Sequence, residues 1–371
     1  MLHTLNRGAT DNFKTPPGDP VAAARRFQIV ITAMILVLLL AMLLDVWTGQ
    51  ADVEKTVTPA VVLQVIWHHV SGNSEHFQIP YADSIVWQIR LPRAVAATIV
   101  GALLALVGTA FQCLLMNPLA DPYTVGVASG AGLGSVTVIL LGGASLLSGY
   151  AQPVAAFVGG LLAVATVYKL AYVGGRASPH TFLLAGTVVG AFFWSMIPLS
   201  IMMSSQAGEN REIRVMSALF GSLAGIGWHR LYLMLIPAVL GSLILIRYSH
   251  EMDIMATGEE MAAHLGVNTA NFMRRTLAIG TLLTATAVAF VGIIAFVGFV
   301  GPHIARRLVG PRHSYLMPVS ALVGAVLLIM ADWLARVFLN DLQVGVVTAF
   351  FGIPLYAALF RKSILPQSSG S

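Results

Sequence analysis

Charge is what this sequence has least of. Only 10% of its 371 residues are Asp, Glu, Lys or Arg, whereas an ordinary soluble domain carries about 25%. A soluble protein of this length could not cover its surface with so few charges, so the composition excludes an ordinary globular domain. Hydrophobic residues make up 57% of the chain, which is typical of a protein that exposes apolar surface to lipid.

The motifs of catalysis and of metal binding are also missing. The single cysteine, Cys113, excludes a disulfide within the chain and lies in an apolar run, where we expect a structural thiol. There is no G-x-x-x-x-G-K-[ST] loop for ATP and no H-E-x-x-H pair for zinc. His303 follows Pro302 and has no second ligand at metal spacing. We therefore expect no enzyme activity, no cofactor and no metal site.

The net charge of +5 does not indicate a nucleic-acid partner. The Lys and Arg residues flank apolar runs and form no basic stripe interleaved with aromatic residues. Most of them fall on one side of the membrane if the N-terminus is cytoplasmic, as the positive-inside rule requires. The pattern predicts a multi-pass protein with both termini in the cytoplasm. It comprises an N-terminal tail over 1–26, a membrane domain over 27–362 and a C-terminal tail over 363–371.

What the sequence does have is a series of apolar runs separated by turn residues. Backbone groups in lipid must be hydrogen bonded internally, so these runs predict helices. We expect an all-α polytopic membrane protein with about ten transmembrane helices. The run at 299–310 is too short to cross alone and predicts either a half-helix or part of a bent pair. A further short helix is expected within 212–226. The predicted spans are 27–47, 92–114, 121–141, 151–173, 180–203, 229–247, 274–296, 299–310, 316–338 and 343–361.

Small residues recur at helical spacing in two of these runs. Gly126, Gly130 and Gly134 are four residues apart, and Gly186 and Gly190 repeat that interval. Glycines at this period let helix backbones approach closely in lipid. We expect close helix packing at these positions.

The segment Trp87-Gln-Ile-Arg-Leu-Pro-Arg93 directly precedes an apolar run on the predicted outer side. Pro92 suits the first turn of a helix, so Arg90 and Arg93 are held near the surface at a fixed spacing. The residues alone leave two interpretations open, which are anchoring at the lipid headgroups and binding of carboxylates.

Two further patterns concern the ends of helices. Asp332 and Arg336 lie four residues apart near the outer end of a predicted span, where they can form an ion pair. The segment 116–122, M-N-P-L-A-D-P, contains two prolines and two turn-forming side chains, and it predicts a tight turn.

A cytoplasmic loop contains the segment 256–267, A-T-G-E-E-M-A-A-H-L-G-V. Thr257 and Glu260 have the spacing of a capping box, and Gly266 suits a left-handed helix end. The pattern predicts a short helix of about two turns. Such a helix could seat in a groove of a soluble partner or could be an ordinary surface helix.

Together these blocks resemble the FecCD family of permeases in type II ABC importers, over roughly residues 27–362. The segment 87–93 and the cytoplasmic-loop segment 258–266, G-E-E-M-A-A-H-L-G, both match the family. Any one block alone would be weak, but several in the same order are specific. The other matching blocks are N-P-L-A-D-P at 117–122, G-V-A-S-G-A-G-L-G at 126–134, G-F-V-G-P-H at 298–303 and A-D-W-L-A-R at 331–336.

The resemblance implies a fold, partners and roles for particular residues. It implies ten transmembrane helices per subunit and a pathway on the axis of a dimer, formed with a second copy or a related permease. Two cytoplasmic ABC ATPase subunits and an extracytoplasmic substrate-binding protein complete such an importer. The binding protein's glutamates would meet Arg90, Arg93 and Arg336. The ATPase-coupling helix would comprise Gly258, Glu259, Glu260, Ala263, Leu265 and Gly266. The cytoplasmic gate would lie at Ser178, Pro179 and His180, where proline and histidine replace the polar residues of the cobalamin permease.

The resemblance also implies a class of cargo, carried across a bacterial cytoplasmic membrane. Ferric siderophore is the expected cargo, and cobalamin and haem are the alternatives. The absence of a P-loop places ATP hydrolysis in a partner chain. Two rival classes are an ion-coupled secondary transporter and an intramembrane enzyme that uses His180 or His303.

Overall fold

The computed structural model describes residues 20–48, 57–72, 80–173, 176–203 and 209–364. Across these ranges the chain is helical apart from turns and a two-stranded antiparallel ribbon, β1 (Tyr172–Val173) and β2 (Arg176–Ala177). Of the two predicted tails, residues 1–19 and 365–371 lie outside the described residues.

A helix forms at every predicted span. Seven of these helices are long and apolar enough to cross a membrane, namely α1, α5, α7, α8, α10, α13 and α15, and α6 and residues 344–358 of α16 are shorter apolar helices. The all-α, polytopic expectation is therefore confirmed, with ten as an approximate count. The bounds are α1 (Pro20–Trp47), α5 (Leu91–Leu114), α6 (Val127–Leu140), α7 (Ala151–Ala171), α8 (Pro179–Met203), α10 (Trp228–Arg247), α13 (Thr269–Val291), α14 (Val297–Val309), α15 (His313–Phe338) and α16 (Val344–Ile364).

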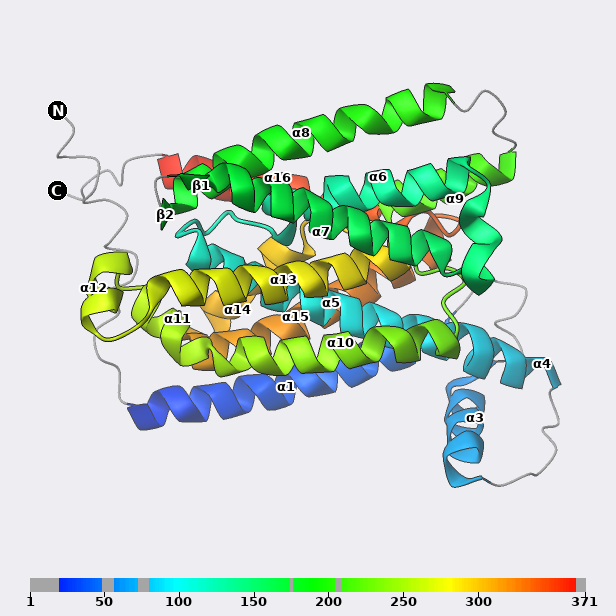
Figure 1. The fold of residues 1–371 in the computed structure, drawn as a ribbon. Helices are drawn as coiled ribbons and strands as arrows, with labels where there is room; N and C mark the ends of the chain where they lie inside the picture. The colour runs from blue at the N-terminus through cyan, green and yellow to red at the C-terminus, as the bar shows by residue number, and fades with distance from the viewer. Residues whose placement is uncertain (1–19, 49–56, 73–79, 174–175, 204–208, 365–371) are drawn as a thin grey trace.

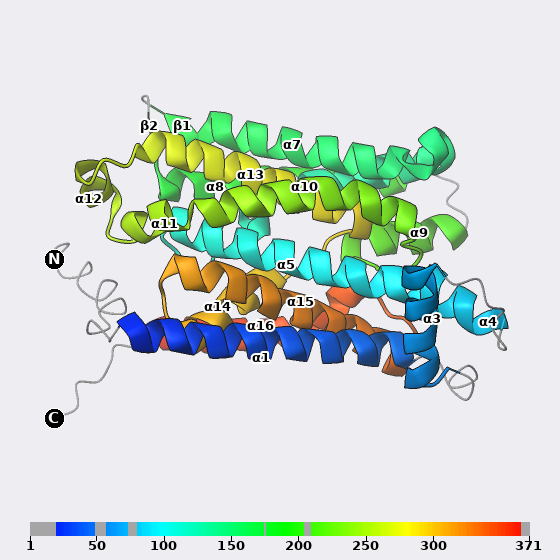
Figure 2. The ribbon, with the colours of Figure 1, turned by 90° about the horizontal axis from the view of Figure 1, so that it is seen from below.

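Shorter elements lie at the two ends of this bundle, except η3, which packs inside it beside the connection from α13 to α14. The long helices run side by side, with α12 at one end and α3 and α4 at the other (Figures 1 and 2), and we refer to the α12 end and the α3 end. The predicted short helix within 212–226 forms as α9. The bounds are α3 (Pro59–Ser71), α4 (Pro80–Asp83), η2 (Ser84–Arg90), η3 (Pro122–Val125), η4 (Gly143–Gly149), α9 (Glu209–Phe220), α11 (Ser249–Met255) and α12 (Glu259–His264).

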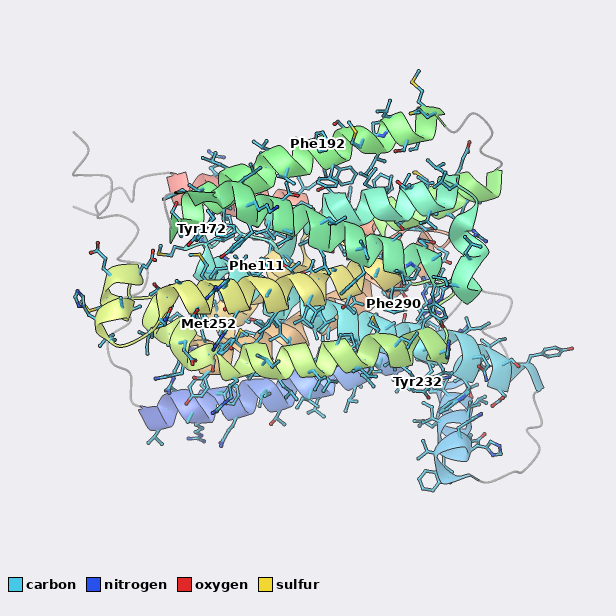
Figure 3. All side chains as sticks on the ribbon, in the orientation of Figure 1. Phe111, Tyr172, Phe192, Tyr232, Met252 and Phe290 are labelled. Atoms are coloured by element: carbon cyan, nitrogen blue, oxygen red, sulfur yellow. The ribbon has the colours of Figure 1, made fainter. Side chains whose placement is uncertain are left out.

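Helix α5 forms the centre of the bundle. In its most apolar stretch 78% of the residues are buried, against 17% in α1, and α5 packs on α10, α13, α14 and α15. Figure 3 shows Phe111 of α5 inside the bundle, while Phe192 lies on the peripheral helix α8. The exposed apolar side chains of α1, such as Leu36 and Leu40, are those that lipid must cover.

Glycines set the closest helix contacts. A Cβ atom on Gly101 of α5 would lie 2.3 Å from the carbonyl oxygen of Gly324 on α15, and the reverse distance is also 2.3 Å. A Cβ atom on Gly108 would lie 1.8 Å from the carbonyl oxygen of Gly298 on α14. Two neighbouring helices can therefore approach α5 this closely because both partners lack side chains.

The glycines singled out in the sequence divide into two groups. Gly130 and Gly134 pack against the α7 backbone and Gly186 against Thr124, each with 2.1–2.3 Å between a built Cβ and a carbonyl oxygen, so close packing is confirmed there. Gly126 instead has a left-handed backbone (φ +82) and precedes α6. At Gly190 the nearest atom to a built Cβ is 3.9 Å away, so close packing does not explain it.

We expect Gly101→Ala to destabilise the fold by about 1–3 kcal/mol or more, because the new methyl group forces α5 and α15 apart. Gly190→Ala is the matched control. It has room for the methyl group and is expected to be neutral or to stabilise α8 by up to about 1 kcal/mol. Thermal unfolding of the detergent-purified variants measures both. Equal melting temperatures for the two variants would contradict the close contact.

The chain breaks between α13 and α14. Helix α13 ends at Val291, five residues before the predicted span ends, and Phe296 has a left-handed backbone (φ +70). The predicted half-helix is confirmed, because α14 has 13 residues and is only about 20 Å long. The turn before α6 satisfies the freed backbone groups, as membrane interiors require. The Tyr123 hydroxyl accepts from the N–H of Ile294 at 3.2 Å, and Asp121 accepts from that of Phe296.

Candidate functional site

The structure brings the three predicted docking arginines together at the α3 end. Arg90 ends η2, Arg93 lies in the first turn of α5, and Arg336 lies in the last turn of α15. None of them is a free surface cation. Their exposed fractions are 6%, 8% and 9%, so each guanidinium needs partners inside the protein.

Arg93 is held by two carboxylates. Its Nε and Nη2 donate to the two oxygens of Asp332 at 2.7 and 2.8 Å, and Nη2 also donates to Asp341 at 2.6 Å. This bidentate geometry is the strong form of the arginine–carboxylate pair. The predicted pair within α15, Asp332 with Arg336, is wrong. Asp332 is fully buried and turned toward α5, where Arg93 satisfies both of its oxygens.

Arg336 and Arg90 both hold the end of α1. Arg336 donates to the carboxylate of Asp45 at 2.6 Å and to the carbonyl oxygen of Thr48 at 2.8 Å, and it also contacts the carbonyl oxygen of Asp45. Arg90 donates to the carbonyl oxygens of Val46 and Trp47 at 3.0 and 2.7 Å. The last carbonyls of a helix lack intrahelical partners, and cations are favourable there. The two arginines therefore cap α1.

We call these three arginines with Asp45, Asp332 and Asp341 the arginine cluster. The cluster holds as many carboxylates as guanidiniums. Arg93 and Arg336 contact carboxylates and Arg90 contacts backbone carbonyls, so the burial of each guanidinium is compensated. Sequence reasoning missed Asp45 and Asp341. Asp45 had a recognisable signal, because it is an acidic residue within an apolar run, and such residues have partners or functions.

The predicted coupling segment forms a short helix that projects from the α12 end (Figure 1). Gly258 (φ +107) precedes it and Gly266 (φ +89) follows it, so the left-handed end at Gly266 is confirmed. The predicted capping box is wrong. No side chain caps α12, and the Thr257 hydroxyl instead donates back to Ile254 of α11 at 2.7 Å.

Helix α12 has one buried anchor and an exposed tip. Ala262 is fully buried, whereas Met261 and Leu265 are 52% and 59% exposed and Glu259 is also exposed. Large apolar side chains on a projecting helix indicate a contact surface. We call the residues 258–266 the α12 knob.

A hydrogen-bonded contact joins α11, next to this knob, to α15. Asp253 of α11 accepts from the backbone N–H of His313 at 2.6 Å and lies 2.9 Å from its Nδ1. His313 begins α15, and the same helix carries Asp332 and Arg336 at its other end. A single helix therefore links the α12 end to the arginine cluster, a connection that sequence reasoning did not find.

The three predicted gate residues lie at the start of α8, directly after β2. Ser178 and Thr181 cap one another, because each side-chain oxygen accepts from the other residue's N–H at 3.2 and 3.0 Å. Pro179 is buried and His180 is exposed. The serine therefore has a local structural role as a helix cap, in addition to any role in gating.

An open pocket of about 370 Å³ lies between η3, α6, α8 and the connection from α13 to α14. Its walls include Tyr123, Ser129, Gly190, Trp194 and Ile293, and none of its described lining residues is charged. The open space at Gly190 belongs to this pocket. A wall of small, apolar and hydroxyl-bearing residues offers a solute few strong polar contacts.

Sequence and structure comparisons complete this description. The profile of the FecCD transport family matches residues 35–362. The uncharacterised ABC transporter permease protein YvrB of Bacillus subtilis is 38% identical over 305 residues, covering 81% of this chain and 85% of that protein. The cobalamin import system permease protein BtuC of Halobacterium salinarum is 41% identical over 281 residues, covering 76% and 74%.

A solved structure agrees with both. A chain of a metal-chelate type ABC transporter in an inward-facing conformation superposes with a TM-score of 0.75 at 28% identity, covering 91% of this chain and 99% of that one. With the family profile, the sequence relatives and the fold in agreement, the protein belongs to the FecCD transport family and is an ABC importer permease.

Proposed function

We propose that this permease forms the membrane pathway for a metal chelate, with cobalamin as its cargo. The observation that carries the proposal is the uncharged lining of the open pocket beside α8, which offers a solute few strong polar contacts and so favours its release. The name of the 41% identical relative, a cobalamin permease, favours cobalamin over the ferric siderophore expected from the sequence. Haem stays a further alternative.

The cargo would be delivered at the α3 end by an extracytoplasmic substrate-binding protein. Its carboxylates would join Arg90, Arg93 and Arg336, each of which has five N–H donors. The Nε atom of Arg336 is buried and has no hydrogen-bond partner among the described residues. Because the cluster is already neutral, an added carboxylate would compete with Asp45, Asp332 or Asp341. Docking would in this way act on the helix ends that these residues hold.

Energy would enter at the α12 end, where two ABC ATPase subunits bind the α12 knobs of a permease dimer. That end would be cytoplasmic, with both termini on the same side. ATP can shift the permease between conformations only by binding them with different affinity. The shift would reach α15 through Asp253 and His313, which are in direct contact.

The exposed face of α8 would line the pathway on the dimer axis. Its apolar side chains include Val188, Phe192 and Trp194, which are 65%, 59% and 43% exposed. The first turn of α8, with Ser178, Pro179 and His180, would form the cytoplasmic gate. Its reciprocal cap keeps this turn helical while α8 moves as a unit.

Uptake by proteoliposomes tests the cargo. The permease, its ATPase partner and its binding protein are reconstituted and supplied with radiolabelled cobalamin, ferric siderophore or haem. We expect ATP-dependent uptake of cobalamin and none of the others. Uptake of ferric siderophore alone would replace cobalamin as the cargo. Concentrative uptake by the permease without an ATPase would instead indicate an ion-coupled transporter.

A further inference from the structure

Helix α3 presents three different faces around its axis. Val62 and Val65 are fully buried against the bundle. Leu63, Trp67 and Val70 follow at helical spacing and are 57%, 70% and 71% exposed. A third face carries Gln64, His68 and Ser71, of which the first and last are exposed. No other described part of the protein covers this apolar face, and contiguous apolar side chains are unfavourable in water. Such a face indicates a binding surface.

The helix is too short to cross a membrane and lies in the wrong direction to do so. Its 13 residues are bounded by the Thr58 side chain, which accepts from Val61, and by Gly72 in a left-handed conformation. In Figures 1 and 2 α3 runs across the direction of the long helices. Since the long helices define the membrane normal, α3 lies in the plane of the membrane.

An aromatic stack fixes both the depth and the rotation of α3. The ring of His69 stacks on Trp87 of η2 with centroids 4.0 Å apart, and its Nδ1 lies 3.5 Å from Asp83. Trp87 in turn contacts Trp228, 5.0 Å away, and Trp228 donates to the backbone carbonyl of Trp87 at 2.8 Å. Tryptophans gather where headgroups meet acyl chains, so this stack places α3 at that depth.

The surface next to α3 is already a lipid surface. Helix α3 packs on α1, a membrane-spanning helix whose Leu39 and Leu40 are exposed and suit contact with lipid. The helix has no Asp, Glu, Lys or Arg among its residues. It therefore offers no charge to attract a docking protein, whereas an apolar face beside a polar one is what an interfacial helix presents to lipid.

We propose that α3 is a membrane-interface helix. Leu63, Trp67 and Val70 insert between the headgroups and acyl chains of the leaflet at the α3 end, while Gln64 and Ser71 stay in water. The contact is apolar, so it does not depend on anionic lipid. It anchors the segment before Arg90 to the bilayer at a fixed depth.

Spin labelling of the full-length permease in liposomes tests the placement. Single cysteines replace Leu63, Trp67, Gln64 or Ser71 in a Cys113→Ala background and receive a nitroxide. Power saturation then compares accessibility to oxygen, which concentrates in lipid, with accessibility to a water-soluble nickel chelate. A label at Leu40 of α1 is the lipid reference and a label at Glu259 is the water reference.

We expect the oxygen-to-nickel ratio at positions 63 and 67 to exceed that at 64 and 71 by at least about threefold, as for a helix half inserted in the interface. The ratio should be the same in phosphatidylcholine with and without phosphatidylglycerol. Equal, water-like ratios at all four positions would overturn the proposal. So would shielding of positions 63 and 67 from both reagents, because a protein would then cover this face.

Discussion

Replacing Asp332 by alanine is expected to cost about 3–5 kcal/mol of the free energy of unfolding, the range for breaking one side of a buried ion pair. Asp332 is fully buried and accepts two hydrogen bonds from Arg93. Without it the guanidinium stays buried with only Asp341 to balance it. The melting temperature of the purified permease, or its yield as a monodisperse protein, measures the loss.

Asp341→Ala is the matched control for this prediction. Asp341 contacts the same Nη2 atom of Arg93 at 2.6 Å, but its side chain is 39% exposed. Water can replace it, so we expect a cost of about 1 kcal/mol or less. The double variant Arg93→Leu with Asp332→Leu should recover much of the loss, because no buried charge then stands alone. Equal losses for the two aspartate variants would show that burial does not decide the strength of these pairs.

The same cluster shows where sequence reasoning stops. The rule for neighbours on a helix assigns Asp332 to Arg336, four residues away. Both residues instead bind partners on other helices, Arg93 on α5 and Asp45 on α1. Local spacing tells which side chains share a face of one helix. It does not say which other helices pack beside it, so pairs between distant residues could not be predicted.

The spans themselves were predictable because the cost of burying polar backbone in lipid is local. Each apolar run must bond its own backbone, and every predicted span contains a helix. No local sequence pattern marked the end of the helix at Val291. Gly292 lies in an unbroken apolar run, and the groups that satisfy the break, Asp121 and Tyr123, are about 170 residues away in the chain. The sequence therefore predicted the turn at 116–122. It did not predict that this turn accepts hydrogen bonds from the connection between α13 and α14.

Capping shows a similar limit at the α12 knob. Thr257 and Glu260 have the spacing of a capping box, yet Gly258 takes the N-cap position with φ +107. This backbone conformation is open to glycine and strained for other residues. It turns the chain away from Thr257, whose hydroxyl bonds α11 instead. The helix and its glycine end were predictable, but the hydrogen bond that begins it was not.

We expect Glu259→Lys combined with Leu265→Asp to abolish most ATP-driven uptake while leaving the permease folded. Both residues are exposed on the α12 knob, so the free energy of unfolding should change by less than about 0.5 kcal/mol, as for other surface substitutions. In the proposed contact with the ATPase, Leu265→Asp replaces an apolar side chain by a carboxylate and Glu259→Lys reverses a negative charge. Uptake in proteoliposomes should fall by about ten- to hundredfold, the usual range of coupling between distant sites.

Two comparisons separate uncoupling from damage to the fold. Glu251→Lys is the same charge reversal on the neighbouring helix α11, outside the knob, and should leave uptake within about twofold, because it touches no proposed contact. Ala262→Asp buries a charge at the base of the knob, where the exposed fraction is 0%, and should lower the melting temperature. Normal uptake in the Glu259 and Leu265 double variant would mean that the exposed tip does not transmit energy. The link between ATP and the pathway would then have to enter the bundle elsewhere, since Asp253 and His313 would receive nothing from α12.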